Sequence, residues 1–212
     1  VNKDGRPDLL ICGEMMPVKI FINTTAGFVD QTSRYFEEGN SGFWNTIEVA
    51  DVDGDGQPDI VAGNLGLNTP LHASIEQPVE LYYADFDENG SVDPFLTFYV
   101  QGVSYPFVSR DELNDQIYSM RKRFVSYRDY STAQLKDIFT PAELATAQKY
   151  TATELRTVVF LNKGDRFVKQ ALPVEAQFSV VNRILVQDAD GDGKTDLLLF
   201  ANRSDNRVKL GS

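Results

Sequence analysis

The stretch "DVDGDGQPDI", residues 51–60, places four aspartates within nine positions and then turns apolar at Ile60 and Val61. These aspartates are Asp51, Asp53, Asp55 and Asp59. Four carboxylates this close repel one another, and a turn by itself asks for only about one or two Asp or Asn residues. A bound cation would relieve the repulsion. The stretch therefore predicts a metal-binding loop rather than an ordinary acidic turn.

The same pattern occurs four times. "DFDENGSVD" covers residues 85–93, "DADGDGKTD" covers 188–196, and the chain opens with "VNKDGRPD", which lacks the first position. Each copy fits D-x-[DN]-x-[DN]-G-x-x-D and is followed by an apolar stretch. The four loops hold thirteen aspartates and so account for much of the formal net charge of -11. Repetition at this spacing predicts a repeat architecture.

The spacing of the loops suits calcium, which takes about six to eight oxygen ligands at about 2.3–2.6 Å. Side chains at loop positions 1, 3, 5 and 9 would supply ligands, position 7 would supply its backbone carbonyl, and Gly at position 6 permits the sharp turn. The predicted metal ligands are Asn2, Asp4, Arg6 and Asp8; Asp51, Asp53, Asp55, Gln57 and Asp59; Asp85, Asp87, Asn89, Ser91 and Asp93; and Asp188, Asp190, Asp192, Lys194 and Asp196. Up to four Ca²⁺ ions are expected, although the first loop lacks its position-1 ligand.

The loops differ from EF-hands, which need a bidentate Glu at position 12 within an exiting helix. Position 12 here is occupied by Ile11, Ala62, Leu96 and Leu199. The segments on both sides of each loop are rich in β-formers, so each loop is expected to join two strands. Thrombospondin type 3 repeats use a similar spacing, but in near-continuous tandem with many cysteines, whereas this chain has one cysteine.

A calcium loop of this kind between strands resembles the FG-GAP/VCBS repeats of integrin α-like β-propellers. "SGFWNTIEVADVDGDGQPDIVAGNLG" carries most of that repeat, with Phe43 in the leading aromatic position. "GNLGLNT" and "YADFDENGSVDPFL" resemble bacterial (Bacteroidetes) VCBS-repeat proteins related to the cartilage acidic protein family. The resemblance spans residues 1–100 and 156–204. It implies an all-β fold with a helical insertion: a partial β-propeller of FG-GAP/VCBS blades, with about four blades represented.

We predict one discontinuous domain, with blades at 1–102 and 156–212 and a helical insertion at 103–155. Hairpins are expected to turn near 25–27 and 163–164. On this assignment, 79–100 and 156–172 form one blade that the insertion interrupts.

The 34 residues from Asp51 to Asp85 are too few for a four-stranded blade. Either the second blade lacks an outer hairpin, or the third loop lies in an atypical position.

Capping boxes mark helices in the insertion: "SRDE" at 109–112, "STAQ" at 131–134 and "TPAE" at 140–143. They predict helices at about 110–123, 132–138 and 141–149. The basic stretch "RKRF" at 121–124 fits either anion binding or a solvated helix face, and we interpret it as the solvated face.

No catalytic residue is predicted. His72 is the only histidine and lies in a polar loop without a nucleophile signature. The acidic charge argues against nucleic acid as a partner, and no apolar run is long enough for membrane insertion. Cys12 is alone and is expected to be a small core residue.

Two functions remain open. One is a calcium-binding, non-enzymatic propeller module of an exported or cell-surface protein, which binds a protein or glycan ligand. The alternative is the propeller portion of a polysaccharide-degrading enzyme of the lyase type. A lyase would be expected to gather Lys, Arg and His near a calcium loop, and no such cluster stands out in the sequence. The binding module is therefore preferred.

An extracellular, cell-surface or periplasmic location is expected, because calcium sites with dissociation constants of about 10⁻⁴–10⁻³ M would be empty in a cytosol. The 212 residues are expected to be a piece of a longer chain with an export signal and further blades. Self-association through incomplete propeller ends is expected as well.

Overall fold

The computed structural model describes residues 1–202 and divides the chain into two compact units. The first unit joins Val1–Pro70 to the chain from Glu154 onward, and the second unit is Leu71–Thr153. The last residues of the predicted blade range 156–212, from 203 onward, lie outside the described residues. Within residues 1–202, no helix is both long enough and apolar enough to cross a membrane.

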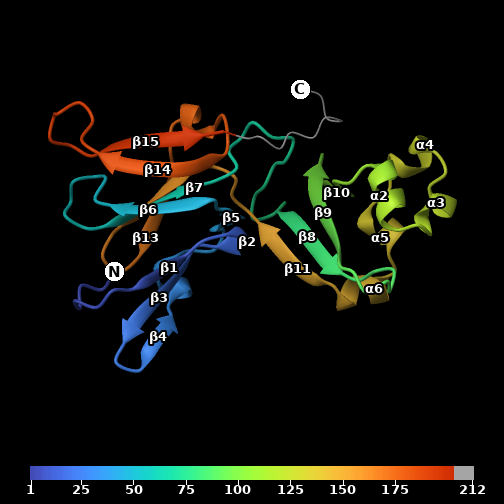
Figure 1. The fold of residues 1–212 in the computed structure, drawn as a ribbon, viewed down its shortest axis with the longest axis horizontal. Coiled ribbons are helices and arrows are strands. Elements are labelled where there is room, and N and C mark those ends of the chain that lie inside the picture. The colour runs from blue at the N-terminus through green and yellow to red at the C-terminus, as the bar shows by residue number, and fades with distance from the viewer. Residues whose placement is uncertain (203–212) are drawn as a thin grey trace. The chain divides into compact units, whose positions relative to one another are not determined.

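Strands dominate both units (Figure 1). The first unit contains β1 (Leu9–Ile11), β2 (Glu14–Pro17), β3 (Lys19–Thr24), β4 (Gly27–Asp30), α1 (Thr32–Tyr35), β5 (Ser41–Phe43), β6 (Thr46–Ala50), β7 (Asp59–Gly63), β12 (Val158–Asn162), β13 (Phe167–Ala171), the 3-10 helix η1 (Val174–Gln177), β14 (Val181–Gln187) and β15 (Asp196–Ala201). The second unit contains β8 (Val79–Ala84), β9 (Asp93–Val100), β10 (Val103–Pro106), α2 (Arg110–Gln116), α3 (Met120–Arg123), α4 (Tyr127–Tyr130), α5 (Leu135–Ile138), α6 (Pro141–Thr146) and β11 (Gln148–Ala152).

Three antiparallel sheets stack in the first unit, in the orders β1-β3-β4, β13-β12-β7-β6 and β14-β15. The middle sheet is apolar on both faces. Its strands β7 and β12 are mostly apolar, and successive side chains of a strand point to opposite sides. Ile60 and Phe160 pack with Ile20 of the first sheet, whereas Val61 packs with Ile184 of β14. Face-to-face packing of this kind is what neighbouring blades require. The described residues contain no closed ring of blades.

The outer hairpin of the middle sheet, β12–β13, follows the second unit in the sequence. β12 pairs with β7, with Val158 opposite Ala62 and Phe160 opposite Ile60. Our prediction that 156–172 completes a blade with 79–100 is therefore wrong. The short interval between the second and third loops has a simple cause: the second unit is inserted between β7 and β12.

Buried polar side chains fix the chain where it returns to the first unit. Asn64 is fully buried, and its amide nitrogen donates to the carbonyls of Glu154 at 2.9 Å and Arg156 at 3.2 Å. Gln177 is also buried and exchanges hydrogen bonds with the backbone of Thr157 at 2.8 and 3.0 Å. Buried amides that lose such partners are costly, so these contacts hold β12 in register with β7.

The second unit has its own sheet, in the order β10-β9-β8-β11, and its own core. Phe95 of β9 lies in that core with Leu113 of α2 and Phe139, which follows α5. The predicted insertion at 103–155 falls almost wholly in this unit, but the unit begins earlier, at Leu71, and includes the third loop.

The capping predictions for the helices hold at two sites out of three. Ser109 and Thr140 form capping boxes with Glu112 and Glu143, and Pro141 is the first residue of α6. The third box starts at Gln134 instead of Ser131. The predicted helix at 141–149 ends at Thr146, because residues 148–152 pair with β8 as strand β11.

Candidate metal centres in the strand-joining loops

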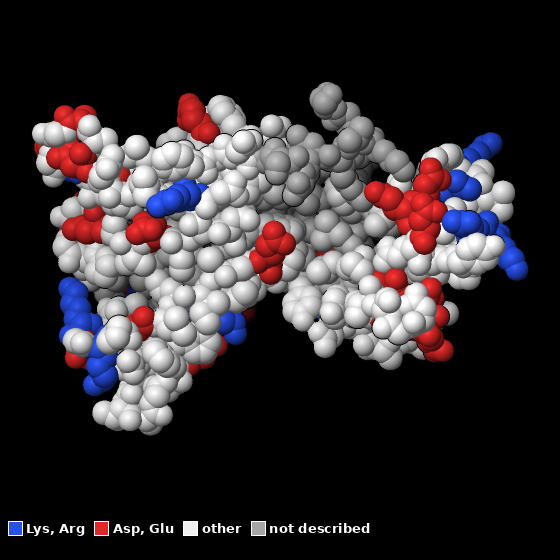
Figure 2. Space-filling view, viewed as in Figure 1, with Lys and Arg blue, Asp and Glu red and all other residues white. Residues whose placement is uncertain are grey.

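Three of the four acidic loops lie at one edge of the first unit, at the left of the view in Figure 1. They precede β1, join β6 to β7, and join β14 to β15. Figure 2 shows acidic side chains gathered along this edge. The remaining loop joins β8 to β9 within the second unit. The prediction that the loops join strands is confirmed where both flanking strands are described.

All four loops share one pattern of positive φ angles. Positions 4 and 6 have positive φ in every copy: 78° and 79° at Gly54 and Gly56, and 57° and 85° at Glu88 and Gly90. The first loop has Lys3 at 58° in position 4, and the fourth loop has two glycines. Only position 6 was anticipated from the sequence. The glycines at position 4 of the second and fourth loops could have predicted the positive φ at that position, because glycine adopts positive φ without strain.

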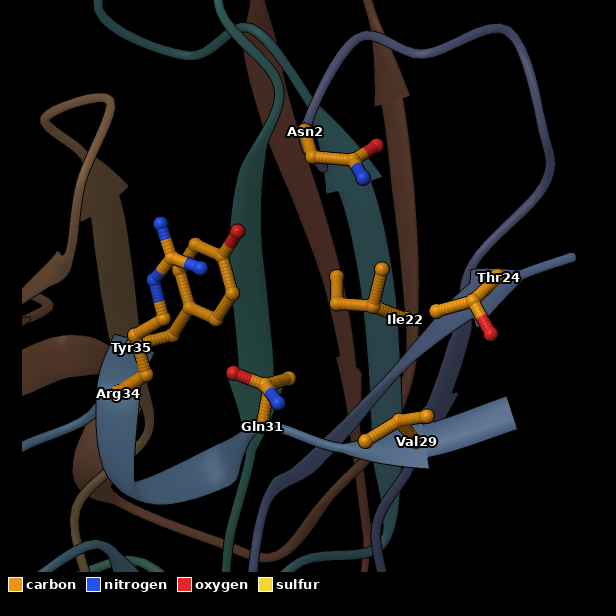
Figure 3. A pocket seen from close by; sticks show the side chains of 7 residues that line it. All are labelled: Asn2, Ile22, Thr24, Val29, Gln31, Arg34 and Tyr35. Atoms are coloured by element: carbon orange, nitrogen blue, oxygen red, sulfur yellow. The ribbon is translucent and has the colours of Figure 1, made fainter. Parts of the chain in front are cut away.

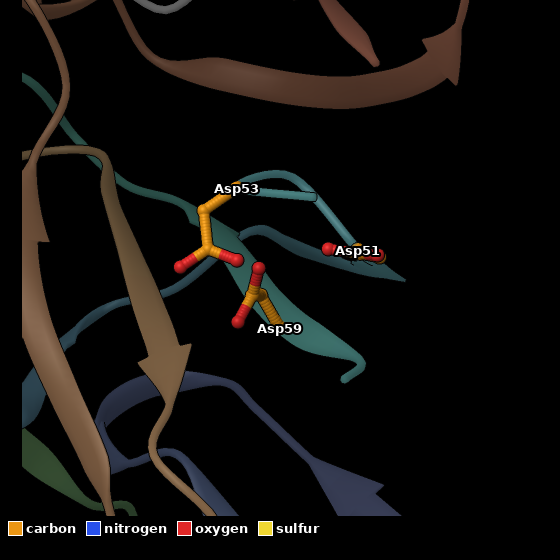
Figure 4. Close-up of side chains that lie close together, drawn as sticks. All are labelled: Asp51, Asp53 and Asp59. Carbon is orange, nitrogen blue, oxygen red and sulfur yellow. The ribbon is translucent and has the colours of Figure 1, made fainter. Parts of the chain in front are cut away.

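Three loops bring carboxylates into close groups. Ligand atoms of positions 1, 3 and 9 lie within 4.8 Å of one another in each. These groups are Asp51, Asp53 and Asp59; Asp85, Asp87 and Asp93; and Asp188, Asp190 and Asp196. In Figure 4 the carboxylates of Asp53 and Asp59 point toward each other. Clustered hard oxygen donors with no sulfur or nitrogen among them fit Ca²⁺, so the donor set agrees with the predicted ion.

The position-1 aspartates also shape the loops. In the second loop, Oδ1 of Asp51 accepts from the backbone nitrogens of Gly54 and Asp55, and Oδ2 accepts from Gly56. Asp188 makes the same three hydrogen bonds in the fourth loop. In these two loops the carboxylate at position 1 therefore holds the backbone of positions 4, 5 and 6 by hydrogen bonds.

Position 5 has a different local role from positions 1, 3 and 9. Its side-chain oxygen accepts from the backbone nitrogen of position 7, as in Asp55 with Gln57 at 2.8 Å and Asp192 with Lys194 at 2.8 Å. Asp4 and Asn89 do the same in the other two loops. The close carboxylate groups of the described loops do not include position 5. In the loops with an aspartate at position 5, the second carboxylate oxygen is the atom that we predict to bind metal; Asn89 of the third loop has a single side-chain oxygen for both roles.

Position 9 ties the first three loops to neighbouring strands or helices. Asp59 is fully buried; Oδ2 accepts from the nitrogen of Val52 at 3.0 Å and Oδ1 from that of Asn162 at 2.8 Å. The amide of Asn162 donates in turn to the carbonyl of Pro58 at 3.1 Å. The first loop repeats this arrangement with Asp8, Asn23 and Pro7. We call it the Asp–Asn clamp; it joins a loop to the first strand of the outer hairpin in its sheet, β3 or β12.

The third loop has a different clamp. Oδ1 of Asp93, which is also buried, accepts from the side-chain nitrogen of Gln116 in α2 at 3.2 Å. A helix of the second unit thus replaces the outer hairpin strand as the partner of position 9.

Cationic side chains form ion pairs in all three loops of the first unit, and in the fourth loop the pair is Lys194 with Asp192 at 3.2 Å. In the first loop, Arg6 pairs with Asp4 at 2.5 Å and donates to the carbonyl of Asn23. In the second, the ammonium of Lys163 lies 2.9 Å from Oδ2 of Asp53. This hydrogen bond holds the pKa of Asp53 below its ordinary value and raises the pKa of Lys163.

Beside the first loop lies a pocket of about 220 Å³ that the sequence did not indicate (Figure 3). It is lined by Asn2, Ile22, Thr24, Val29, Gln31, Arg34 and Tyr35. Its wall is mostly apolar, and the guanidinium of Arg34 lies 5.4 Å from the centre of the Tyr35 ring. Asn2 belongs both to this wall and to the predicted ligands of the first loop.

The first 62 residues contain two acidic loops with the same φ pattern, and each is followed by a strand and held by an Asp–Asn clamp. These residues match the model of the family described as the FG-GAP-like repeat. The chain therefore carries an FG-GAP-like repeat. The match covers the first two loops, and the third and fourth repeat their φ pattern outside it. Neither the curated proteins nor the solved structures include a match to the chain. The relation to bacterial VCBS-repeat proteins of the cartilage acidic protein family stays a prediction.

Proposed function

We propose that the chain is a calcium-binding, non-enzymatic propeller module of an exported or cell-surface protein, and that it binds a protein or glycan partner. The observation that carries the calcium part is the repetition of one geometry. Three separate loops place carboxylates of positions 1, 3 and 9 within 4.8 Å of one another. Like charges held this close favour a divalent cation, which would offset their repulsion.

Calcium would be held by the same positions in each loop. Asp51, Asp53 and Asp59 would supply carboxylate oxygens in the second loop, with Asp55 and the carbonyl of Gln57 completing the set. The chain's own contribution is to preorganise these groups: Asp59 is fixed by two backbone nitrogens and Asp51 by three. Preorganisation lowers the cost of gathering the ligands around the ion.

Substitutions at positions 5 and 7 test the ligand assignment. Asp55→Ala and Asp192→Ala each remove a charged ligand and should weaken calcium binding at their own loop by about tenfold or more. Gln57→Ala and Lys194→Ala should leave the affinity nearly unchanged, because only the carbonyls of these residues are used. Calorimetric titration with CaCl₂ measures both effects. A large loss from Gln57→Ala would contradict the backbone role of position 7.

The surface that we assign to the partner lies on α4 and on the segments that join α2, α3 and α4 in the second unit. Tyr118, Val125 and Tyr127 are 72%, 67% and 63% exposed. The guanidinium of Arg121 lies over the Tyr118 ring and that of Arg110 over the Tyr127 ring, at 4.9 and 5.0 Å from the ring centres. Exposed Tyr and Arg side chains are enriched among the residues that dominate binding interfaces.

A glycan array probed with the intact chain tests the binding part. We expect retention of a defined glycan class in millimolar calcium, and a loss of retention in the double variant Tyr118→Ala, Tyr127→Ala. Val29→Ala, which changes an exposed apolar residue of the first unit, serves as the control. If the double variant and the Val29→Ala control are retained equally, the partner does not bind at Tyr118 and Tyr127. Release of unsaturated sugars from a retained polysaccharide would instead support the lyase alternative.

A further inference from the structure

Lys163 carries a positive charge onto the second loop from a part of the chain that is remote in sequence. It lies in the turn between β12 and β13, and its ammonium is 2.9 Å from Oδ2 of Asp53 and 3.8 Å from Oδ2 of Asp55. Asp53 and Lys163 are 110 residues apart. The side chain of Lys163 is 43% exposed, and those of the two aspartates are 30% and 32% exposed.

The position of this lysine is set by the Asp–Asn clamp. Asn162, the preceding residue, is fixed to the second loop by two hydrogen bonds. Its backbone nitrogen donates to Asp59, and its side-chain nitrogen donates to the carbonyl of Pro58. Its side-chain oxygen also accepts from the nitrogen of Gly164, which closes the turn at 2.9 Å. The backbone on both sides of Lys163 is therefore held against the loop, and the ammonium lies on the carboxylates of positions 3 and 5.

The other loops have no equivalent of Lys163. In the first sheet the clamp residue Asn23 is followed by Thr24, which carries no charge, and the cation on that loop, Arg6, belongs to the loop itself. Asp85, Asp87 and Asp93 of the third loop make no ion pair with a Lys or Arg of the described chain. In the fourth loop the cation is Lys194, which belongs to the loop itself and is 82% exposed. Lys163 is thus an addition to the repeat and not a part of it.

We propose that Lys163 is a tethered counter-ion that lowers the calcium affinity of the second loop alone. This inference rests on the proposed calcium-binding function. Without metal, the ammonium neutralises part of the charge of Asp53 and Asp55. A calcium ion at the same carboxylates repels the ammonium, so Lys163 has to withdraw when the ion binds.

The test compares Lys163→Gln with the native chain, and follows each loop separately by NMR during titration with CaCl₂. The amides of Gly54 and Gly56 report on the second loop, because they donate to Asp51. The amides of Gly191 and Gly193 report on the fourth loop in the same sample. We expect Lys163→Gln to lower the calcium midpoint of the second loop by about twofold to fivefold, and to leave the fourth loop unchanged.

Two control variants distinguish the effect of the Lys163 contact from the effect of losing one positive charge. Lys122→Gln removes the same charge from a lysine of α3 and should shift neither midpoint. Lys163→Arg retains the charge and should keep a midpoint close to the native one. Equal midpoints for Lys163→Gln and the native chain would overturn the proposal, as would an equal shift in Lys122→Gln.

A measurement on the native chain needs no substitution. The side-chain Cε and Nζ signals of Lys163 should shift in step with Gly54 and Gly56 as calcium is added. Signals that stay constant while these amides shift would also overturn the proposal. If none of the four glycine amides responds to calcium in the native chain, the proposed calcium binding itself has failed, which is a different result.

Discussion

In millimolar calcium the chain is expected to melt many degrees above its melting temperature in EGTA. A site filled to 100 times its dissociation constant adds ~2.7 kcal/mol to the free energy of unfolding by mass action. In a domain of about 150–250 residues, each kcal/mol raises the melting temperature by about 2–4 °C, so one filled loop is worth roughly 5–10 °C. Calorimetric melting curves in EGTA and in CaCl₂ measure the difference.

The two units make this experiment more informative. The first unit holds three loops and the second holds one, so separate transitions should shift by different amounts. Magnesium at equal concentration is the control, because it prefers smaller octahedral sites and keeps several of its waters. Superimposed curves in EGTA and calcium would show that the carboxylate groups do not bind the ion.

Asp59→Ala should destabilise the chain even when no calcium is present. The substitution leaves two backbone nitrogens without their acceptors, that of the half-buried Val52 and that of the buried Asn162. A buried donor without a partner costs about 1–3 kcal/mol, so we expect a loss of roughly 2–5 kcal/mol in EGTA. Urea unfolding in EGTA gives this value directly.

Asp55→Ala is the matched control, because Asp55 is exposed: it caps the nitrogen of Gln57 within the same loop, and its other oxygen lies 3.8 Å from the exposed ammonium of Lys163. Its loss in EGTA should be below about 1 kcal/mol, while its loss of calcium affinity should be large. Equal destabilisation by the two variants in EGTA would mean that the clamp contributes nothing to stability beyond metal binding.

Local spacing in the sequence was sufficient to predict the loops and both hairpins. The regular positions of Asp and Gly match the oxygen ligands and the sharp turn that a calcium loop needs, and few other structures need both. The apolar residue at position 12 excludes the EF-hand. β3–β4 and β12–β13 are found where alternation and turn residues place them. Cys12, expected in the core, is half-buried and packs against the core between the first two sheets.

Strand pairing across the second unit was not predicted, because periodicity shows that a strand exists but not which strand it pairs with. Both β7 and β9 offer apolar strands after an acidic loop. One local signal did distinguish them. Pro58 precedes Asp59 as Pro7 precedes Asp8, and the hairpins of both sheets contain Asn at the clamp position, in "FIN" and "FLN". The third loop has Val92 in place of this proline.

The helix boundaries failed for a related reason. β11 follows α6 directly, and Tyr150 pairs with Leu81 of β8 in the sheet of the second unit. Pairing with a strand that lies far away in sequence overrides a local helical preference. The cap at Ser109, by contrast, depends only on residues within one helical turn, and such signals are reliable from sequence.

The insertion of the second unit between β7 and β12 has a consequence for synthesis. The Asp–Asn clamp joins residues 103 positions apart, so β7 cannot receive its partner until that length of chain has been made. At about 5–20 residues per second, the wait on the ribosome is roughly 5–20 s. During this interval the edge of β7 is unpaired, and such edges invite association with other chains. Slower translation of residues 71–153 would lengthen the period of risk, and rare codons there should raise the insoluble fraction of a protein whose sequence is unchanged.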